Sequence, residues 1–269
     1  MRAYLCSMIF NSMKELVIHC EDSGLPPKIN WNEALTSAHE GIVLVYGNTQ
    51  GMPASVTDVA FALLSADEQE RAQKLRKEEQ RTTFIINHAL NRLFLSSLSG
   101  ENPRNIKIVQ ESGGKPYAEQ PYPFFNLSDS GTAFLQGYAP VSLGVDIEYI
   151  DPQMEYEPIA GRFFTLREIR HILRSGRPWF FKYWTRKEAL LKATGLGIID
   201  SLHCIEVITG VNILGQRCAE RLPLPETGYY SVKSFPLHEY YLSVASLHNK
   251  PISSICLLNS QRLAEIFAV

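Results

Sequence analysis

Two stretches decide the fold of this chain: LGVDIE at residues 143–148 and YWTRKEALLKATGLG at residues 183–197. In the first, apolar and acidic residues alternate, which is typical of a half-buried strand whose carboxylates share one face. In the second, large apolar residues recur at helical spacing, and Gly195 stands where a left-handed cap would end a helix. If the helix packs beside the strand, acidic and basic side chains of both stretches converge.

The converging residue types suit one chemistry. The hard carboxylate oxygens of Asp146, Glu148 and Glu188 suit Mg²⁺, which shares its shell with waters and substrate phosphates. No His or Cys accompanies them, so a zinc site is not indicated. Lys192, one helical turn after Glu188, indicates phosphoryl transfer, in which a protein positions groups and neutralises charge. The same spacing also fits an exposed strand face and a Glu–Lys ion pair worth ~0.2–0.5 kcal/mol, and spacing alone does not separate the two interpretations.

Composition excludes several classes of protein. The chain has 269 residues, 45% hydrophobic and 20% charged, with a net charge of −2, as in a soluble protein of one large or two small domains. The charge argues against nucleic acid as a partner, and the apolar runs fall short of the ~20 residues that cross a bilayer. The N-terminal apolar run has no cleavage site of a signal peptide. The five cysteines are scattered without CxxC spacing, so we expect no disulfide framework and a cytoplasmic location.

One pattern of elements occurs twice along the chain. A capping box at residues 65–68 precedes a long predicted helix over about 79–97, and a matching box at 165–168 precedes a helix over about 179–194. We therefore predict an α+β fold of two similar, pseudo-symmetric lobes, each a small antiparallel sheet packed with a long helix, with a ligand site between them. The predicted units are an N-terminal extension at residues 1–40, an N-terminal lobe at 41–143 and a C-terminal lobe at 144–269.

Strands are predicted from short β-branched or alternating runs. We expect them at residues 41–46, 106–109, 133–138, 141–149, 204–208, 229–235, 241–245 and 254–257. The segment FFNLSDSG at residues 124–131 is interpreted as an aromatic stretch that runs into a polar loop.

Several short motifs stand in a fixed order. They are GKP (114–116), FNLS (125–128), GVDIE (144–148), RFF (162–164), WTRKEA (184–189) and GLG (195–197). Together, over roughly residues 60–209, they resemble the 4′-phosphopantetheinyl transferase superfamily. The length and two-lobed plan are similar to its long branch, the surfactin-synthetase-activating or Sfp-like enzymes, and this resemblance implies a monomer.

The resemblance implies a reaction. The 4′-phosphopantetheine arm of coenzyme A would be transferred to a serine of an apo carrier protein of fatty-acid, polyketide or peptide synthesis, releasing 3′,5′-ADP, with Mg²⁺ as cofactor. On this basis Asp146, Glu148 and Glu188 hold the metal ion. Glu188, directly or through a metal-bound water, helps remove the serine proton, and Lys192 neutralises the pyrophosphate. Contacts to coenzyme A are assigned to Arg81, Lys115, Pro116, Ser128, Asp129, Asp146 and Lys192.

Position 129 departs from the family's pattern. The family usually reads Asn-x-Ser-His-Ser, with the histidine on the 3′-phosphate of coenzyme A, whereas this chain has Asp129. A carboxylate ~4 Å from a phosphate costs about 1 kcal/mol per charge pair in water and about 4 at an effective dielectric constant of about 20. Either Asp129 turns away, another cation compensates, or coenzyme A binds weakly; a repacked loop is the neutral alternative. Dephospho-coenzyme A lacks the 3′-phosphate. We predict that it is a poorer substrate than coenzyme A by a smaller factor here than in a relative with the histidine.

Two further features have competing interpretations. Glu168 matches an acidic residue that the family has near its site, but its place in a capping box explains it without chemistry, and we favour the cap. Between residues 162 and 192 lie nine Arg and Lys against two Glu. This excess indicates steering of an acidic carrier protein, with a solvated helix face as the alternative. The remaining histidines are interpreted as structural. For His88, on the long helix near Arg81, we favour packing between helices, with a position facing the nucleotide as the alternative.

Two other functions compete with the transferase. A non-catalytic relative that binds coenzyme A or a carrier protein would explain Asp129 but has no need of the set Asp146, Glu148, Glu188 and Lys192. A Mg²⁺-dependent phosphotransferase of unrelated fold would retain Mg²⁺ chemistry without binding coenzyme A.

Overall fold

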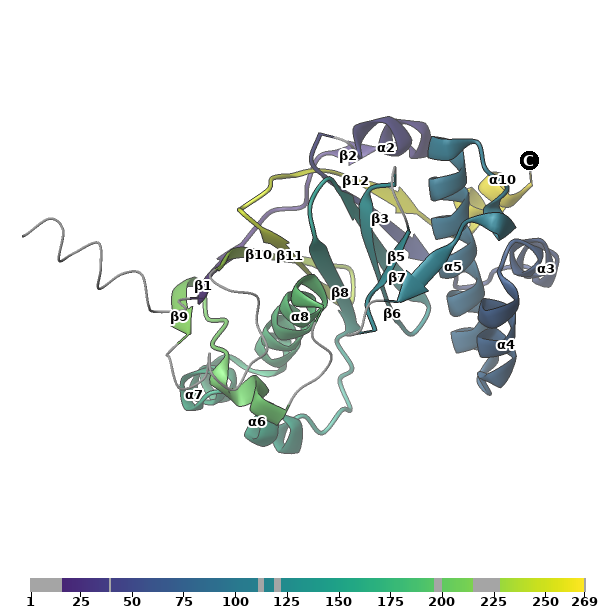
Figure 1. The fold of residues 1–269 in the computed structure, drawn as a ribbon. Helices are drawn as coiled ribbons and strands as arrows, with labels where there is room; N and C mark the ends of the chain where they lie inside the picture. The colour runs from purple at the N-terminus through teal and green to yellow at the C-terminus, as the bar shows by residue number, and fades with distance from the viewer. Residues whose placement is uncertain are drawn as a thin grey trace, which may run out of the picture.

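The computed structural model describes residues 16–38, 40–110, 114–118, 122–195, 200–214 and 228–268 (Figure 1). Gly113, Gly197 and the N-terminal apolar run lie outside the described residues. The described elements are, in chain order, β1 (Leu16–Asp22), β2 (Lys28–Ile29), α2 (Trp31–Ser37), β3 (Ile42–Asn48), α3 (Ala54–Ala62), α4 (Ala66–Lys74), α5 (Glu78–Ser99), η2 (Pro103–Asn105), β4 (Ile108–Gln110), β5 (Pro116–Ala118), β6 (Phe124–Ser130), β7 (Ala133–Ala139), β8 (Leu143–Tyr149), α6 (Glu157–Phe163), α7 (Leu166–Ser175), α8 (Arg177–Thr194), η3 (Asp200–Cys204), β9 (Gly210–Leu214), β10 (Gly228–Leu237), β11 (Tyr240–Leu247), β12 (Ile252–Leu258) and α10 (Ser260–Phe267).

Two five-stranded sheets form the centre of the molecule, with strand orders β8-β11-β10-β1-β9 and β2-β12-β3-β7-β6. Most neighbours are antiparallel, but β1 pairs with β10 in parallel, and β12 pairs in parallel with both β2 and β3. A separate ribbon joins β4 and β5. The predicted α+β architecture of two sheets, each with its own long helix, is confirmed.

The sheets exchange strands between the two halves of the chain. Strand β1 lies between β10 and β9 in the sheet of the C-terminal half, and β12 lies between β2 and β3 in the sheet of the N-terminal half. The sheets therefore do not follow the predicted boundaries at residues 40/41 and 143/144. Separations this long along the chain leave no local pattern in the sequence.

Strand alternation sorts the core into layers. On β3, Val43 and Val45 pack with the helices that cover one sheet, whereas Leu44 packs toward the other sheet. On β8, Val145 and Ile147 join the same inter-sheet cluster. The order is thus helix, sheet, sheet, helix, with α5 and α8 on the two outer faces (Figure 1). The apolar face of β8 is buried between the two sheets. Because side chains alternate along a strand, the acidic face of β8 is directed toward α8.

The predicted helix ends are confirmed. Side chains of Ser65 and Thr165 cap α4 and α7 through reciprocal capping boxes. Both α5 and α8 end at a left-handed glycine, Gly100 and Gly195, each with φ of 75°. Only a residue without Cβ adopts this conformation at little cost, which is why the sequence pattern located both ends correctly.

One strand prediction and one loop prediction were wrong. Residues 204–208 form no strand; η3 ends at Cys204, and the strand β9 begins only at Gly210. The apolar residues of that segment are buried in the helix-covered core. Their backbone groups bind side chains instead of a strand: the Ile205 carbonyl accepts from Lys187, and the Val207 N–H donates to Glu168. Conversely, the expected polar loop after Leu127 continues as strand β6 to Ser130, because its side chains bind an adjoining strand edge.

Candidate active site

The site lies where the edge strands of the two sheets, β6 and β8, come together. Alternate side chains of β6 reach β8: Asn126 Oδ1 accepts the Val145 backbone N–H at 2.8 Å, and Ser128 Oγ donates to Asp146 Oδ1 at 2.9 Å. The Ser130 hydroxyl donates to Glu148 Oε2, also at 2.9 Å. The motif Asn-x-Ser-x-Ser therefore joins the two sheets and orients both carboxylates of β8.

Gly144 lets helix α8 lie directly on β8. A Cβ atom at Gly144 would stand 2.0 Å from the carbonyl oxygen of Ala189 and 2.4 Å from the backbone nitrogen of Ala193. No side chain fits there, so glycine is required by close packing rather than by its backbone angles. This contact sets the turn of α8 that carries Glu188 and Lys192 against the acidic face of β8.

Lys192 bonds to the strands instead of to its helix neighbour. Its Nζ donates to Asp146 Oδ1 at 2.7 Å and to Ser128 Oγ at 2.9 Å, while its side chain stays 28% exposed. The Glu188–Lys192 ion pair that spacing alone allowed is not formed among the described contacts. The ammonium group therefore stands at the mouth of the carboxylate cluster, within reach of a ligand's negative charge.

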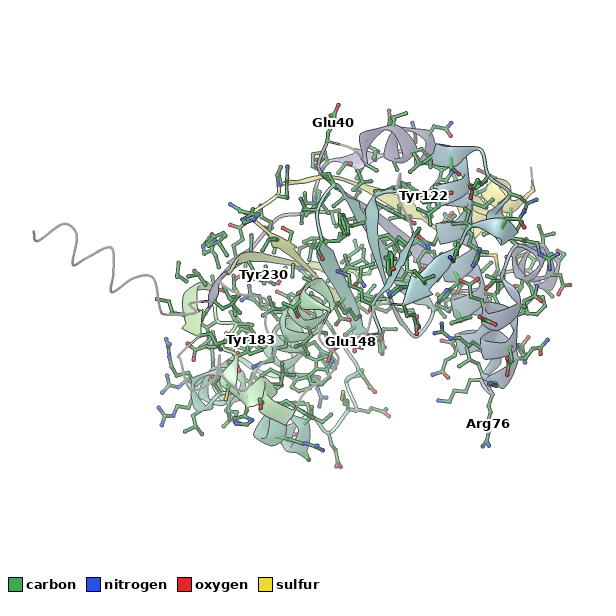
Figure 2. All side chains as sticks on the ribbon, viewed as in Figure 1. Glu40, Arg76, Tyr122, Glu148, Tyr183 and Tyr230 are labelled. Carbon is green, nitrogen blue, oxygen red and sulfur yellow. The ribbon has the colours of Figure 1, made fainter. Side chains whose placement is uncertain are left out.

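The surroundings of the three carboxyl groups raise the pKa of each of them. Burial raises the pKa of Glu188 to about 7, with a further contribution from the charge of Asp146 that exceeds the opposing effect of Lys192. Burial and the Asp146 charge likewise raise the pKa of Glu148 to about 7, against hydrogen bonds from Ser130 and Trp184. Burial also raises the pKa of Asp146, despite its contacts with Lys192 and Ser128. Lys192 therefore does not offset the effect of burial on the three acids. Figure 2 shows one of them, Glu148, between the two halves of the molecule.

Two oxygen atoms of the cluster are buried without a hydrogen-bond partner in the described part of the chain. They are Asp146 Oδ2 and Glu188 Oε1. Such orphaned atoms are costly unless a ligand or ion satisfies them, and hard carboxylate oxygens are what Mg²⁺ prefers. The donor set therefore fits a divalent cation chemically. As the side chains lie, however, the described residues hold no group of three or more His, Cys, Asp or Glu already arranged to hold a metal ion.

A cavity of about 690 Å³ opens on the N-terminal side of the cluster. Helices α4 and α5 form one wall, and the β4–β5 ribbon and β6 form the other. Arg71 places its guanidinium 5.2 Å from the centre of the Phe84 ring. Across from it, Asp129 lines the cavity and is exposed to it. The walls combine an aromatic ring, backbone edges and charges of both signs, as in a site for a polar ligand with a ring.

A buried network forms the floor of the cavity. Arg92 Nε lies 2.5 Å from Glu68 Oε2, and its Nη1 donates to the Pro103 and Ile106 carbonyl oxygens. His88 Nδ1 lies 3.3 Å from the other oxygen of Glu68. Burial opposes ionisation of Glu68, but the contacts with His88 and Arg92 lower its pKa to about 2.

Not all predicted coenzyme A contacts line the cavity. Pro116 and Asp129 do, but Arg81 and Lys115 do not. Lys115 Nζ donates to Ser142 Oγ at 2.7 Å, to the Leu143 carbonyl oxygen at 2.9 Å and to the carbonyl oxygen of Ala193 at 3.4 Å. It thereby fastens the end of α8 to the start of β8.

Glu168 caps its helix, as favoured from the sequence. Its carboxylate accepts the Thr165 backbone N–H at 2.8 Å and the Val207 backbone N–H at 2.8 Å. It also forms a fully buried ion pair of 2.9 Å with Lys187, whose ammonium binds the carbonyl oxygens of Leu202 and Ile205. The arrangement repeats that of Glu68 and Arg92 in the other half: capping box, buried pair, and carbonyls of the loop after the long helix.

Two residues of the site were missed, Arg71 and Trp184. Arg71 follows Glu68 by three positions on α4, so their shared helix face was a usable signal. His88 was not missed: it lines the cavity, in line with the alternative left open from the sequence. The contact of Trp184 with Glu148 joins α8 to β8, which no sequence spacing reveals.

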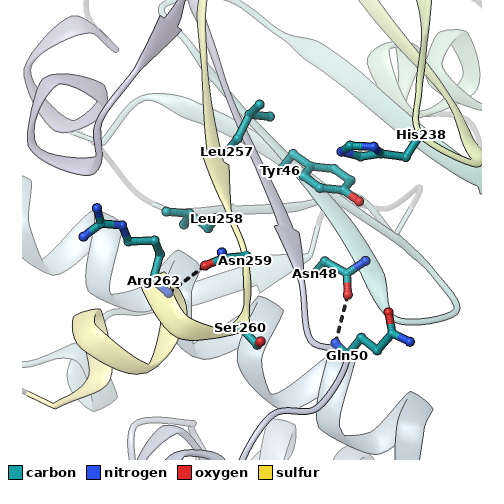
Figure 3. A pocket seen from close by; sticks show the side chains of 9 residues that line it. All are labelled: Tyr46, Asn48, Gln50, His238, Leu257, Leu258, Asn259, Ser260 and Arg262. Carbon is teal, nitrogen blue, oxygen red and sulfur yellow. Dashed lines mark hydrogen bonds between the residues drawn. The ribbon is translucent and has the colours of Figure 1, made fainter.

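A second cavity of about 550 Å³ lies away from the carboxylates, among β3, β12, the start of α10 and the β10–β11 turn (Figure 3). The rings of Tyr46 and His238 face each other across one side. Asn48 and Asn259 each accept a nearby backbone N–H, from Gln50 and Arg262. None of the predicted site residues lines it.

Comparison with known proteins shows which family the sequence around this site resembles. A family model described as the 4′-phosphopantetheinyl transferase superfamily matches residues 142–244, which include β8 and α8 with all four residues of the cluster. The resemblance to this superfamily that the sequence motifs predicted is confirmed. The 4′-phosphopantetheinyl transferase HetI of Nostoc sp. (strain PCC 7120) is 38% identical over 157 residues, which cover 54% of this chain and 65% of HetI.

Other phosphopantetheinyl transferases match the chain over different lengths. A putative 4′-phosphopantetheinyl transferase of Synechocystis sp. (strain PCC 6803), slr0495, is 28% identical over 207 residues, covering 70% of this chain and 81% of that protein. Sfp of Bacillus subtilis (strain 168) is 25% identical over 152 residues, covering 55% of this chain and 67% of Sfp. Among the described residues, no helix is long and apolar enough to traverse a bilayer.

Proposed function

We propose that this chain transfers the 4′-phosphopantetheine arm of coenzyme A to a serine of an apo carrier protein and releases 3′,5′-ADP. The observation that carries the proposal is the assembly of Asp146, Glu148, Glu188 and Lys192 beside a nucleotide-sized cavity, in a chain that resembles this superfamily. In the reaction, the serine oxygen bonds to the β-phosphorus of coenzyme A. The bond from that phosphorus to the bridging oxygen breaks, and 3′,5′-ADP keeps the oxygen.

Glu188 is the proposed base. Its Oε1 has no hydrogen-bond partner among the described residues, so it can accept the serine proton. Its pKa of about 7 suits a group that takes up a proton near neutral pH. Lys192, at the exposed mouth of the cluster, neutralises charge on the pyrophosphate as 3′,5′-ADP leaves.

Asp146, Glu148 and Glu188 would hold Mg²⁺. The orphaned oxygens of Asp146 and Glu188 and the raised pKa values of all three carboxyls support a cation at this place. When bound, Mg²⁺ would neutralise charge on the pyrophosphate.

The cavity of about 690 Å³ is the proposed place of the nucleotide. Arg71 is suited to a phosphate of coenzyme A, because its guanidinium is exposed and forms no ion pair within the described residues. Asp129 stands in the same cavity, where burial raises its pKa against the opposing effects of His88, Lys192 and Asn87. Pro116 lines the wall, whereas Ser128 and Asp146 reach the ligand from the β6–β8 edge.

The proposal extends to the setting of the reaction. We propose an acidic carrier protein as acceptor, a monomer as working form, and the cytoplasm as location. The described cysteines Cys20, Cys204 and Cys256 are free thiols, which suits a reducing compartment.

Mass spectrometry of apo acyl and peptidyl carrier proteins incubated with this chain, coenzyme A and Mg²⁺ tests the proposal. A mass gain of one phosphopantetheine, lost with EDTA and with Glu188→Gln, is expected. If no carrier gains mass although coenzyme A binds in calorimetry, the non-catalytic binder is the better description. In that case Asp129→His tests whether position 129 is the cause.

A further inference from the structure

Helix α7 carries an outward face of unusual composition. Leu166 and Leu173 are 72% and 68% exposed, although most large apolar side chains of the chain are buried. At about 100° per residue, Leu166, Leu173 and the exposed Arg170 lie within about 60° of one another around the helix. Arg174 and Arg167 extend the same face, so that all five lie within about 120°. This set of Leu166, Arg167, Arg170, Leu173 and Arg174 is named the α7 face.

The opposite side of α7 is fully used in folding. Ile172 and Glu168 are buried, the latter in its ion pair with Lys187 of α8. His171 contacts Tyr183 of α8. The helix is therefore anchored by one side only. Within the described part of the chain, the α7 face does not pack against the core. Nothing in the fold requires leucine at positions 166 and 173.

The charge of the α7 face is one-sided. Arg167 pairs with Glu206 at 2.5 Å, with its own side chain still 70% exposed. No carboxylate lies within ion-pair distance of Arg170 or Arg174 in the part of the chain described, and Glu168, the acidic residue of α7, is turned inward. Two leucines one heptad apart beside three arginines complement a partner helix with apolar residues along one edge and carboxylates along the other.

The α7 face is connected to the candidate site through neighbouring contacts. Immediately before α7, Phe163 packs edge-to-face on Trp184, with ring centres 5.8 Å apart. Trp184 in turn lies close enough to Glu148 of the carboxylate cluster to lower the pKa of that carboxyl. A protein held on α7 is thus held on the half of the molecule that carries the acids and the base.

We infer that the α7 face is the docking surface for an acidic amphipathic helix of the carrier protein substrate. The inference rests on the proposed function and adds the residues that recognise the partner. The arginines steer the acidic partner, and the leucines hold it once it is docked. A membrane is the less suited occupant, because two leucines present a narrow apolar strip whereas interfacial helices bury a wide one.

Steady-state transfer to an apo carrier that the wild type modifies tests the docking surface. Arg170→Glu/Arg174→Glu is expected to raise KM for the carrier about tenfold or more at low salt, with less effect at high salt, because exposed charges mainly govern association. Leu166→Ser/Leu173→Ser is expected to raise it severalfold at any salt. For both variants, KM for coenzyme A and kcat at saturating carrier are expected to stay unchanged. A folding defect would instead lower kcat.

A matched control is available on strand β9. Val211 and Ile213 are each 65% exposed but have no arginines beside them on their strand, so Val211→Ser/Ile213→Ser is expected to leave KM for the carrier unchanged. If both α7 variants keep KM within twofold of the wild type, the docking inference falls while the proposed function stands. If the wild type modifies no carrier, the proposed function fails first, and the assignment of this partner fails with it.

Sedimentation with vesicles of phosphatidylcholine and phosphatidylserine tests whether the α7 face binds a membrane instead. Binding by the wild type that the α7 variants lose, together with an unchanged KM for the carrier, would show a membrane-binding face and overturn the carrier assignment. Absence of vesicle binding with a raised KM supports it.

Discussion

Replacing Glu188 by Gln should stabilise the folded chain above neutral pH and abolish transfer at the same time. The Glu188 carboxyl is largely buried, one of its oxygens is unpartnered, and the Asp146 charge is close by. These surroundings raise its pKa from 4.5 to about 7, so ionised Glu188 opposes folding. Glutamine keeps the shape and removes the charge.

The sign and size follow from proton linkage. Between pH 4.5 and about 7 the folded chain holds the Glu188 proton while the unfolded chain has lost it, so stability falls as pH rises through this window. At about 1.4 kcal/mol per pH unit the full loss is about 3 kcal/mol. Because Glu188 is partly exposed and solvent screens its charge, we expect Glu188→Gln to gain about 1–2 kcal/mol above the window and almost nothing below it.

Urea unfolding of both proteins at about pH 5 and about pH 8 measures the difference. Glu155→Gln, at an exposed loop position, is the matched control and should show no gain at either pH. Added Mg²⁺ should stabilise the wild type at the higher pH more than it stabilises Glu188→Gln, because the variant lacks one of the three carboxylates. A gain equal at both pH values would refute the reasoning, since it could not come from the ionised carboxylate.

Three further experiments test the packing around the site, each by chemical denaturation. Gly144→Ala should destabilise by about 2–3 kcal/mol through overpacking against α8, whereas Gly161→Ala, which meets nothing within 4 Å, should gain about 0.5–1 kcal/mol; equal effects would contradict the close contact. Glu168→Gln and Lys187→Met should each cost about 3–5 kcal/mol alone and clearly less than the sum together, and simple additivity would count against a coupled pair. Lys115→Met should cost about 2 kcal/mol and lower kcat with little change in KM for coenzyme A; a selective rise of that KM would instead make Lys115 a ligand contact.

Local chemistry made much of the fold predictable. Helices α4 and α7 begin at capping boxes, and α5 and α8 end at left-handed glycines, because a few neighbouring residues determine these features. The alternation on β8 correctly assigned Val145 and Ile147 to the core. Strand β1 and the pairing of β12 were not predictable, since their partners lie at the other end of the chain.

The site was predictable as a set of residues but not as a network. Spacing and motif order brought Asp146, Glu148, Glu188 and Lys192 together, and the structure places Lys192 on Asp146 rather than beside Glu188. Which acceptor a long lysine reaches depends on how α8 lies on β8, and that depends on tertiary packing. For the same reason the sequence could not separate Lys115, bound to Ser142 and to backbone carbonyls, from a ligand contact.

The exchange of strands between the sheets bears on how the molecule is made. Strand β12 lies near the C-terminal end of the described chain, yet it sits inside the sheet that supports β6, and β1 must wait for β10 before it gains its parallel neighbour. During synthesis the N-terminal half therefore emerges from the ribosome with a gap in its sheet that only residues 252–258 fill. Contacts this distant in sequence form slowly. A nascent chain therefore cannot complete the sheet that carries β6 until β12 has left the ribosome.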